Sequence, residues 1–169
     1  IKVGGDKCDE AIVKSVRRKH NALIGDRTAE EIKRTVGCVY PRSEEAIMEV
    51  RGRCLMTGLP RTFTVSSSEI LDALEEVSSA IVEAVHWVLE RTPPELTGDI
   101  SANGITMTGG GSLIWGFDKL IASKTGIPTR VADEAVSCVA YGTGNCLENL
   151  SKMQDGTMNL SRQRQMKAR

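Results

Sequence analysis

The last third of the chain alternates strand-like and helix-like segments around a run of three glycines, and this pattern limits the possible folds more than any other feature. Residues 104–108 predict a short strand, the glycines at 109–111 a turn, and residues 112–125 a helix. A second strand over 128–132 and a final helix over 135–150 follow. Two successive βα units are typical of a parallel sheet covered by helices, so we predict an α/β fold.

The turn Thr108-Gly109-Gly110-Gly111-Ser112 carries the most chemical information. Glycines permit positive φ angles and have no Cβ that would keep a ligand away from the backbone. A helix that follows such a turn directs unpaired N–H groups and the positive end of its dipole toward it, which favours an anion. A tight turn without a ligand is the alternative. The chain has no GxxxxGK[ST] loop and no GxGxxG motif that opens a helix in a first βαβ unit.

The first third of the chain predicts two helices. Residues 1–3 suggest a strand, and Asp6 is a suitable N-cap for a helix with apolar side chains at helical spacing. Thr28 and Glu31 stand at capping-box spacing, so a second helix is expected to start at Thr28 and to stop near Gly37.

A hairpin is predicted next. The strand-like runs 46–55 and 61–65 flank a turn that contains glycine and proline. We therefore expect a small α+β subdomain over residues 28–65, inserted into a larger subdomain formed by residues 1–27 and 66–150.

The longest predicted helix follows the hairpin. Ser66 and Glu69 again stand at capping-box spacing, apolar residues recur at three- and four-residue steps to about Arg91, and Thr92-Pro93-Pro94 ends the pattern. The final residues, 151–169, are polar and basic and predict a disordered tail. A weak contact with an acidic partner or an anionic lipid is the alternative for this tail.

Composition excludes several classes of protein. The 22 basic and 22 acidic side chains give a net charge of zero, which argues against a nucleic-acid binder held by bulk charge. No apolar run approaches the roughly 18–20 residues that a membrane span needs. The five cysteines are an odd number without a CxxC pair, so we expect reduced thiols in a cytosolic protein. The chain also starts at Ile1 in a strand-like segment, which suggests a piece of a longer protein.

Several stretches in one order resemble a known family. They are Val3-Gly4-Gly5-Asp6-Lys7, Asp9-Glu10-Ala11-Ile12, residues 24–33, Glu49-Val50-Arg51-Gly52-Arg53, Thr57-Gly58-Leu59-Pro60, Thr92-Pro93-Pro94-Glu95-Leu96 and residues 108–113. Together they resemble the C-terminal half of the MreB family, the rod-shape-determining bacterial actin homologues. The resemblance runs from Ile1 to about Leu150.

This resemblance implies the fold of the actin, sugar-kinase and heat-shock-chaperone ATPases, in which two ribonuclease-H-like domains enclose a nucleotide. The chain would then supply an actin-like large subdomain and the small inserted one. The implied nucleotide-binding residues are Glu30, Glu31, Lys33, Gly109, Gly110, Gly111 and Ser112. In this scheme the glycine turn matches the adenosine motif, and the helix with Glu30 holds the ribose and adenine from the other side. Without the resemblance, an exposed Glu30–Lys33 pair worth roughly a few tenths of a kcal/mol is the simpler interpretation.

The family's phosphate-binding hairpins, metal-holding Asp and water-positioning Glu match no position in this chain, so no catalytic residue is assigned. The implied cofactor is ATP, with Mg²⁺ held mainly by an N-terminal half upstream of Ile1. The full-length protein would be a slow ATPase, and this chain alone would not be catalytic.

The implied function is that of an ATP-binding, filament-forming protein that determines rod cell shape by organising peptidoglycan synthesis. Its implied partners are further copies of itself, the cell-wall elongation machinery and the inner-membrane surface, without nucleic acid. The implied location is the cytoplasm, at the inner face of the cell membrane. A sugar or small-molecule kinase of the same superfamily and a non-hydrolysing filament scaffold are the alternatives.

Overall fold

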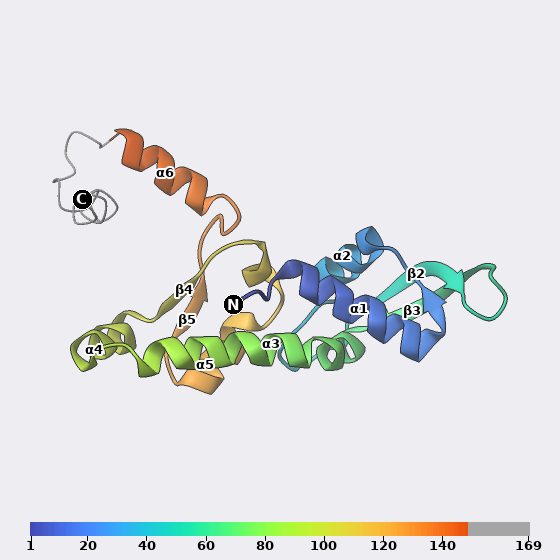
Figure 1. The fold of residues 1–169 in the computed structure, drawn as a ribbon, viewed down its shortest axis with the longest axis horizontal. Helices are drawn as coiled ribbons and strands as arrows, with labels where there is room; N and C mark the ends of the chain where they lie inside the picture. The colour runs from blue at the N-terminus through green and yellow to red at the C-terminus, as the bar shows by residue number, and fades with distance from the viewer. Residues whose placement is uncertain (149–169) are drawn as a thin grey trace, which may run out of the picture. The chain divides into compact units, whose positions relative to one another are not determined.

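The structure is a computed structural model that describes residues 1–148, and the chain divides into two units, Ile1–Ala135 and Val136–Arg169. Residues 149–169, which include the predicted tail, lie outside the described part. The elements of the described part are α1 (Gly5–His20), β1 (Ala22–Leu23), α2 (Asp26–Thr35), β2 (Ile47–Cys54), β3 (Pro60–Ser66), α3 (Ser67–Glu90), α4 (Pro94–Asn103), β4 (Ile105–Met107), the 3-10 helix η1 (Gly110–Leu113), α5 (Phe117–Thr125), β5 (Thr129–Val131) and α6 (Cys138–Glu148) (Figure 1).

The predicted hairpin is confirmed as β2 and β3, which form an antiparallel sheet with β1 in the order β1-β2-β3. The register pairs Val50 with Phe63, and both of these side chains are buried. Alternation along β3 also buries Val65, so one face of the hairpin packs on the core while the other faces solvent.

The core of the first unit joins this sheet to three helices. Helix α1 packs against α2 on one side and against α3 on the other. Each helix contributes an apolar stripe at three- and four-residue spacing. The buried members of these stripes are Ile12 and Val16 on α1, Ala29 and Ile32 on α2, and Ile70 and Leu74 on α3. A fully buried Ile or Leu stabilises the fold by about 1.5–3 kcal/mol.

The two helix starts predicted in the first third are wrong in detail. Residues 1–3 form no strand in the described part of the chain, and α1 begins at Gly5 with extended Gly4 as its N-cap. Asp6 lies in the first helical turn, where its charge still complements the helix dipole. Helix α2 begins two residues before Thr28, with Gly25 as its N-cap and without a capping side chain.

The long helix is confirmed as α3. The Ser66 hydroxyl accepts a hydrogen bond from the Glu69 amide at 3.4 Å, which is the cap that the spacing predicts. The prolines that end this pattern also start a helix that the sequence analysis missed, α4, with Pro94 in its first turn. Proline favours this position because its missing N–H has no helical partner there and its φ is already helical.

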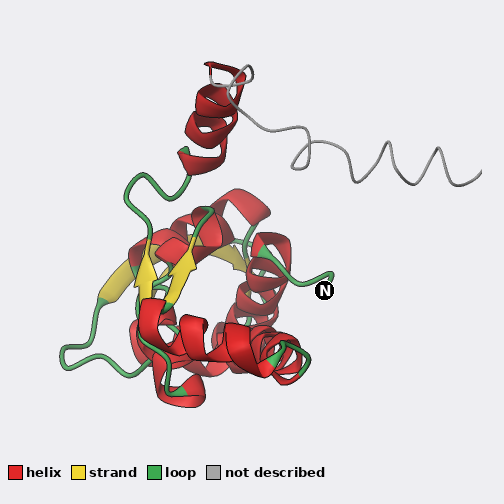
Figure 2. Ribbon diagram, turned by 90° about the vertical axis from the view of Figure 1, so that its left-hand side faces the viewer, coloured by secondary structure: helices red, strands yellow, loops and turns green. Residues whose placement is uncertain are grey.

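The predicted βα units are confirmed in outline. Strands β4 and β5 pair in parallel from Ile105–Thr129 to Met107–Val131, and they lie side by side in Figure 2. The expected helix over 112–125 is wrong, because the chain forms the short 3-10 helix η1 and then α5. Gly116 separates the two, with a φ of 81°. A Cβ on Gly116 would lie 2.5 Å from the Cβ of Tyr40, so glycine is required there.

The second unit is described by α6, which occupies residues within the helix predicted over 135–150. No helix among residues 1–148 combines the length and the apolar composition that crossing a membrane requires.

Candidate functional site

The triple-glycine turn follows β4 and is held by hydrogen bonds to the segment after β5 and from the Ser112 side chain. The Gly109 amide donates to the Ala135 carbonyl oxygen at 2.7 Å, which ties the turn to the segment after β5. The Ser112 hydroxyl donates to the Gly109 carbonyl oxygen at 2.6 Å, and the Ser112 side chain is buried. Ser112 therefore shapes the turn from inside and does not present its hydroxyl to solvent.

The three glycines do not share one conformation. Gly109 has a φ of 85°, whereas Gly110 and Gly111 lie in η1 with ordinary negative φ, so the expectation of positive φ is confirmed for Gly109 alone among these three. A Cβ built on any of the three meets no described heavy atom within 4 Å. The backbone of this turn is therefore accessible from outside the unit, as the sequence analysis expected.

The electrostatic argument for an anion at this turn is not supported in its original form. It required a regular helix to start directly after the glycines, but η1 has four residues and α5 begins only at Phe117. The dipole argument applies to the aligned peptides of an α-helix, whereas η1 is a single short 3-10 helix. Backbone accessibility, not a helix N-terminus, is the property that this turn offers to a ligand.

The other predicted nucleotide-binding residues, Glu30, Glu31 and Lys33, lie on helix α2, and each has different surroundings. Glu30 pairs with Arg34 one turn later, at 2.7 Å on the surface. Glu31 is exposed. Lys33 instead points toward α1, where its Nζ lies 2.8 Å and 2.9 Å from the two carboxylate oxygens of Asp9. The simple Glu30–Lys33 surface pair is therefore wrong, because each side chain pairs with a different partner.

The Lys33–Asp9 pair is largely shielded from water, with 13% of the lysine and 18% of the aspartate side chain exposed. The Lys33 ammonium also lies 3.4 Å from the Gly5 carbonyl oxygen, at the first turn of α1. The neighbouring Cys8 thiol has a raised pKa because of its burial, despite the nearby Lys33 charge. Sequence reasoning missed the role of Asp9, which it named only within a stretch that resembles the family.

The structure joins the end of α2 to the segment that follows the glycine turn. The Val39 amide donates to the Trp115 carbonyl oxygen at 3.0 Å, and Cys38 forms a parallel bridge with Trp115. The Arg42 guanidinium and the Lys119 ammonium lie 4.8 Å and 4.5 Å from the centre of the Trp115 ring. Nothing in the local pattern around Trp115 indicates the contacts with Cys38, Val39 and Arg42, because they connect segments far apart in the sequence.

Solved structures similar to this chain identify its fold. MreB5 of Spiroplasma citri bound to ADP superposes with a TM-score of 0.86 at 39% identity, covering 90% of this chain and 46% of that one. The MamK double helical filament superposes with a TM-score of 0.68 at 20% identity, which shows the fold alone. The chain thus has the actin-like α/β fold that the sequence analysis predicted.

Comparison with protein families then identifies the family within this fold. The model of the MreB/Mbl protein family matches residues 1–155, and the chain belongs to this family. It is 48% identical over 153 residues to the cell shape-determining protein Mbl of Bacillus cereus, covering 90% of this chain and 46% of that protein. It is 50% identical over 148 residues to the cell shape-determining protein MreB of Escherichia coli, covering 88% and 43%. The chain spans about half the length of these relatives.

Proposed function

We propose that this chain is the C-terminal half of an ATP-binding, filament-forming bacterial actin homologue that determines rod cell shape by organising peptidoglycan synthesis. Curated relatives about half identical to the chain are cell shape-determining proteins. The observation that carries the nucleotide part is the likeness to MreB5, solved with ADP and with AMPPNP at TM-scores of 0.86 and 0.85. The MamK filament is an example of a protein of this fold that assembles with copies of itself, which supports the filament part of the proposal.

The glycine turn suits the adenosine part of the nucleotide. Side chains at Gly109, Gly110 and Gly111 would project into space that no described atom of the chain occupies. A flat base or a sugar can approach a backbone of this kind closely. In this proposal Ser112 keeps the turn in shape through its bond to the Gly109 carbonyl.

Helix α2 supplies the polar contacts in this proposal. Glu30 and Glu31 carry accessible carboxylates, which accept hydrogen bonds from ribose hydroxyls. In this proposal Lys33, which pairs with Asp9, acts on the nucleotide site by holding α2 against α1 and leaves the two carboxylates to contact the nucleotide.

The subdomain division belongs to the same proposal, with residues 28–65 as a small subdomain inserted between residues 1–27 and 66–150. Mg²⁺ is held mainly by the N-terminal half upstream of Ile1, and hydrolysis is slow in the full-length protein. This chain alone does not turn over ATP, because phosphoryl transfer requires a positioned metal and water.

The proposed partners are further copies of the protein, the cell-wall elongation machinery and the inner face of the cell membrane. The proposed location is therefore the cytoplasmic surface of that membrane.

Sedimentation of the full-length protein tests the central proposal. We expect ATP to bind stoichiometrically by isothermal titration and to increase the fraction of protein in the high-speed pellet. A full-length protein that binds no adenine nucleotide, or that pellets equally with and without it, contradicts the proposal.

A further inference from the structure

His20, the last residue of α1, lies where three elements of the first unit meet. Its Nε2 atom is 2.8 Å and 3.0 Å from the two carboxylate oxygens of Glu69, in the first turn of α3. Its ring stacks on the ring of Phe63 from β3, with the ring centres 4.7 Å apart and the planes inclined by 25°. The Arg61 guanidinium, also from β3, donates to the His20 carbonyl oxygen at 3.1 Å. One residue therefore connects the end of α1, the start of α3 and the hairpin.

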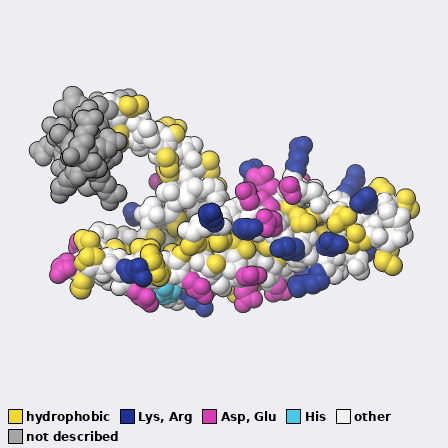
Figure 3. Space-filling view, viewed as in Figure 1, with side chains coloured by type: hydrophobic (Ala, Val, Ile, Leu, Met, Phe, Trp, Pro, Cys, Tyr) yellow, Lys and Arg dark blue, Asp and Glu magenta, His cyan; other side chains and the backbone are white. Residues whose placement is uncertain are grey.

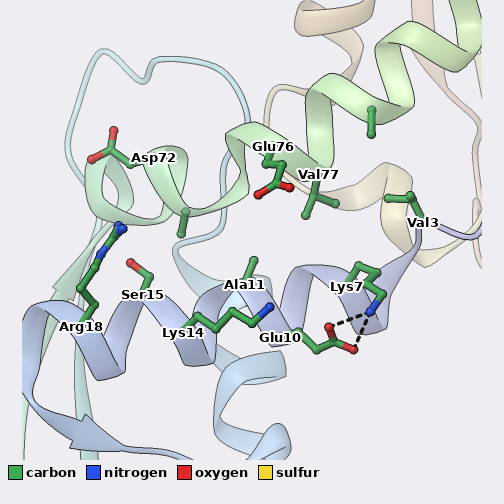
Figure 4. A pocket seen from close by; sticks show the side chains of 12 residues that line it. Val3, Lys7, Glu10, Ala11, Lys14, Ser15, Arg18, Asp72, Glu76 and Val77 are labelled. Atoms are coloured by element: carbon green, nitrogen blue, oxygen red, sulfur yellow. Dashed lines mark hydrogen bonds and ion pairs between the residues drawn. The ribbon is translucent and has the colours of Figure 1, made fainter.

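The antiparallel packing of α1 and α3 brings these groups together. Figure 4 shows the last turns of α1, with Arg18, beside the first turns of α3, with Asp72. At this end of the two helices, Lys19 Nζ lies 3.2 Å from the Asp72 carboxylate. His20 and Glu69 are 49 residues apart in the sequence, so no local pattern indicates that they form a pair.

The His20–Glu69 pair is shielded from water, whereas the neighbouring charges are not. The exposed fraction is 19% for the His20 side chain and 12% for the Glu69 side chain. The neighbouring charged residues on the packed elements are all exposed, and they are Arg17, Arg18 and Lys19 on α1, Arg61 on β3 and Asp72 on α3. Figure 3 shows basic side chains over α1 and acidic side chains along α3. Because water and salt screen such surface charges, direct contact with Glu69 has the larger effect on the imidazole.

Protonation of His20 changes the charge of this pair and keeps its hydrogen bond. A neutral imidazole with its proton on Nε2 already donates to Glu69, and a second proton on Nδ1 adds a positive charge next to the carboxylate. The C-terminal end of α1 also favours a positive charge at this position. The folded chain therefore takes up this proton more readily than the unfolded chain does. It follows that this charge stabilises the fold at low pH and that the gain is lost as the pH rises through the range of about 5 to 8, in which imidazoles titrate.

Phe63 transmits the state of His20 to the hairpin. Only 7% of Phe63 is exposed, and in the register of the hairpin it stands opposite Val50, of which 2% is exposed. The His20 ring forms part of the surface on which Phe63 packs. A weaker hold on His20 therefore loosens a main apolar contact between the hairpin and the helices.

We propose that His20, Glu69 and Phe63 form a pH-sensitive clasp that holds the hairpin of β2 and β3 against α1 and α3. The clasp is strongest at about pH 6, and at about pH 8 the imidazole is neutral and the hairpin separates from the helices more often. In the proposed subdomain division, His20 and Glu69 belong to the larger subdomain and Phe63 to the small one, so pH sets how firmly the small subdomain is held. The clasp does not rest on nucleotide binding, and its failure would leave the proposed nucleotide site intact.

Urea unfolding of the 169-residue chain at pH 6 and at pH 8 tests the clasp. The chain should carry Cys54→Ser, because hydrogen bonding from Thr57 lowers the pKa of the Cys54 thiol to about 7, within the same range. A lowered thiol pKa stabilises the folded chain as the pH rises, which is opposite to the effect of the clasp. In this background we expect the equilibrium constant of unfolding to be about fivefold larger at pH 8 than at pH 6.

Matched variants identify the groups that cause the pH dependence. His20→Gln retains an N–H donor but does not titrate, and Glu69→Gln retains an acceptor but removes the negative charge. Each of these two variants should lose the difference between pH 6 and pH 8. His86→Gln replaces the other histidine of the chain and should keep the difference. Groups that titrate elsewhere in the chain contribute equally to all variants and cancel in this comparison.

Hydrogen exchange of the Cys54→Ser chain distinguishes opening of the hairpin from a general loss of stability. The protection factor compares the exchange rate of an amide with its rate in an unfolded chain at the same pH. For the paired amides of β2 and β3 it should fall about fivefold between pH 6 and pH 8. The amides of α5 provide an internal reference, and their protection should change less.

Four results would overturn the proposal. The first is an equilibrium constant of unfolding that is the same at pH 6 and pH 8. The second is a pH dependence that persists in His20→Gln or Glu69→Gln although circular dichroism shows the variant folded. The third is a pH dependence that His86→Gln abolishes, and the fourth is an equal loss of protection in the hairpin and in α5.

Discussion

Lys33 of α2 and Asp9 of α1 form a largely buried ion pair, with the lysine nitrogen 2.8 Å and 2.9 Å from the two carboxylate oxygens. The pair fixes the side of α2 that faces α1, while Glu30 and Glu31 remain on other faces of the helix. In the proposed function, Lys33 thus serves charge pairing inside the unit, and Glu30 and Glu31 are left for ligand contact outside it.

Asp9→Asn should destabilise the chain on the order of 2 kcal/mol, because it leaves the Lys33 charge shielded from water without a counter-charge. Chemical denaturation measures this loss. Lys33→Met combined with Asp9→Leu should recover most of it, since an apolar pair of similar size leaves no unpaired charge. Equal losses in the single and double variants would contradict this cause, because the double variant contains no unpaired charge.

Glu30→Ala in the full-length protein should weaken nucleotide binding by about 1–3 kcal/mol, the cost of a lost partner in a desolvated site. Stability without nucleotide should change little, because the Glu30–Arg34 pair is exposed. Isothermal titration and thermal melting separate the two effects. Arg34→Ala removes the same surface pair and serves as the control, with nucleotide affinity expected to stay at the parent value.

Gly110→Ala should leave the melting of the full-length protein unchanged, because Gly110 has no positive φ and its added methyl meets no atom of the chain within 4 Å. Nucleotide affinity should fall at least about tenfold, or ~1.4 kcal/mol, since the methyl would occupy the space of the nucleoside. Gly109→Ala is the contrasting variant. An alanine forced into the φ of 85° and ψ of 165° at position 109 should lower the stability by about 1–3 kcal/mol. A Gly110→Ala protein that binds ATP like the parent would leave the glycines as a turn only.

Gly116→Ala should destabilise the chain by about 3 kcal/mol, through a positive φ and a methyl placed 2.5 Å from the Tyr40 Cβ. Thermal or urea unfolding measures the loss. Combining it with Tyr40→Gly should remove the clash and leave the backbone strain, so part of the loss should remain relative to Tyr40→Gly alone. Full tolerance of Gly116→Ala would show that the backbone adjusts at this position.

Cys54 should be alkylated more readily than Cys8 or Cys38. Hydrogen bonding from Thr57 lowers its pKa to about 7, whereas burial raises the pKa of Cys8 and of Cys38. The thiolate is the reactive form, so its alkylation rate should rise with pH and reach half its maximum near pH 7. Mass-spectrometric peptide mapping follows each site. Thr57→Val should shift the Cys54 midpoint to higher pH, and an unchanged midpoint would contradict the assigned cause.

Local signals predicted most of the elements that the structure contains. The hairpin, the cap of α3 by Ser66 and the βα order of the last third all depend on turn residues and spacing within one segment. The break at Gly116 was missed because residues 112–125 have the pattern of one helix, and the reason for the break is Tyr40, far away in the sequence. A strand was expected at residues 1–3 because their residue types favour extended backbone. A strand also needs a neighbour to pair with, and residue types do not show whether one is present.

In the candidate site, too, some features could be predicted from local sequence and others depend on tertiary packing. The accessible backbone at Gly110 could be predicted, because it follows from the absence of side chains. The partner of Lys33 could not, because Asp9 lies on another helix and Glu30, three residues away, offered a local alternative. Residue type indicated which groups could bind a ligand, and tertiary packing decided which of them were already paired.

The bridge between Cys38 and Trp115 has a mechanical consequence. It fastens the segment after α2 to the segment after the glycine turn, and two cations on the Trp115 ring reinforce the junction. If a nucleoside lies between α2 and the turn, the spacing available to it is fixed, because moving the two segments apart would break the contacts at Trp115. Selection between a larger and a smaller base would then depend on the side chains that line this space and not on a change in the distance between α2 and the turn.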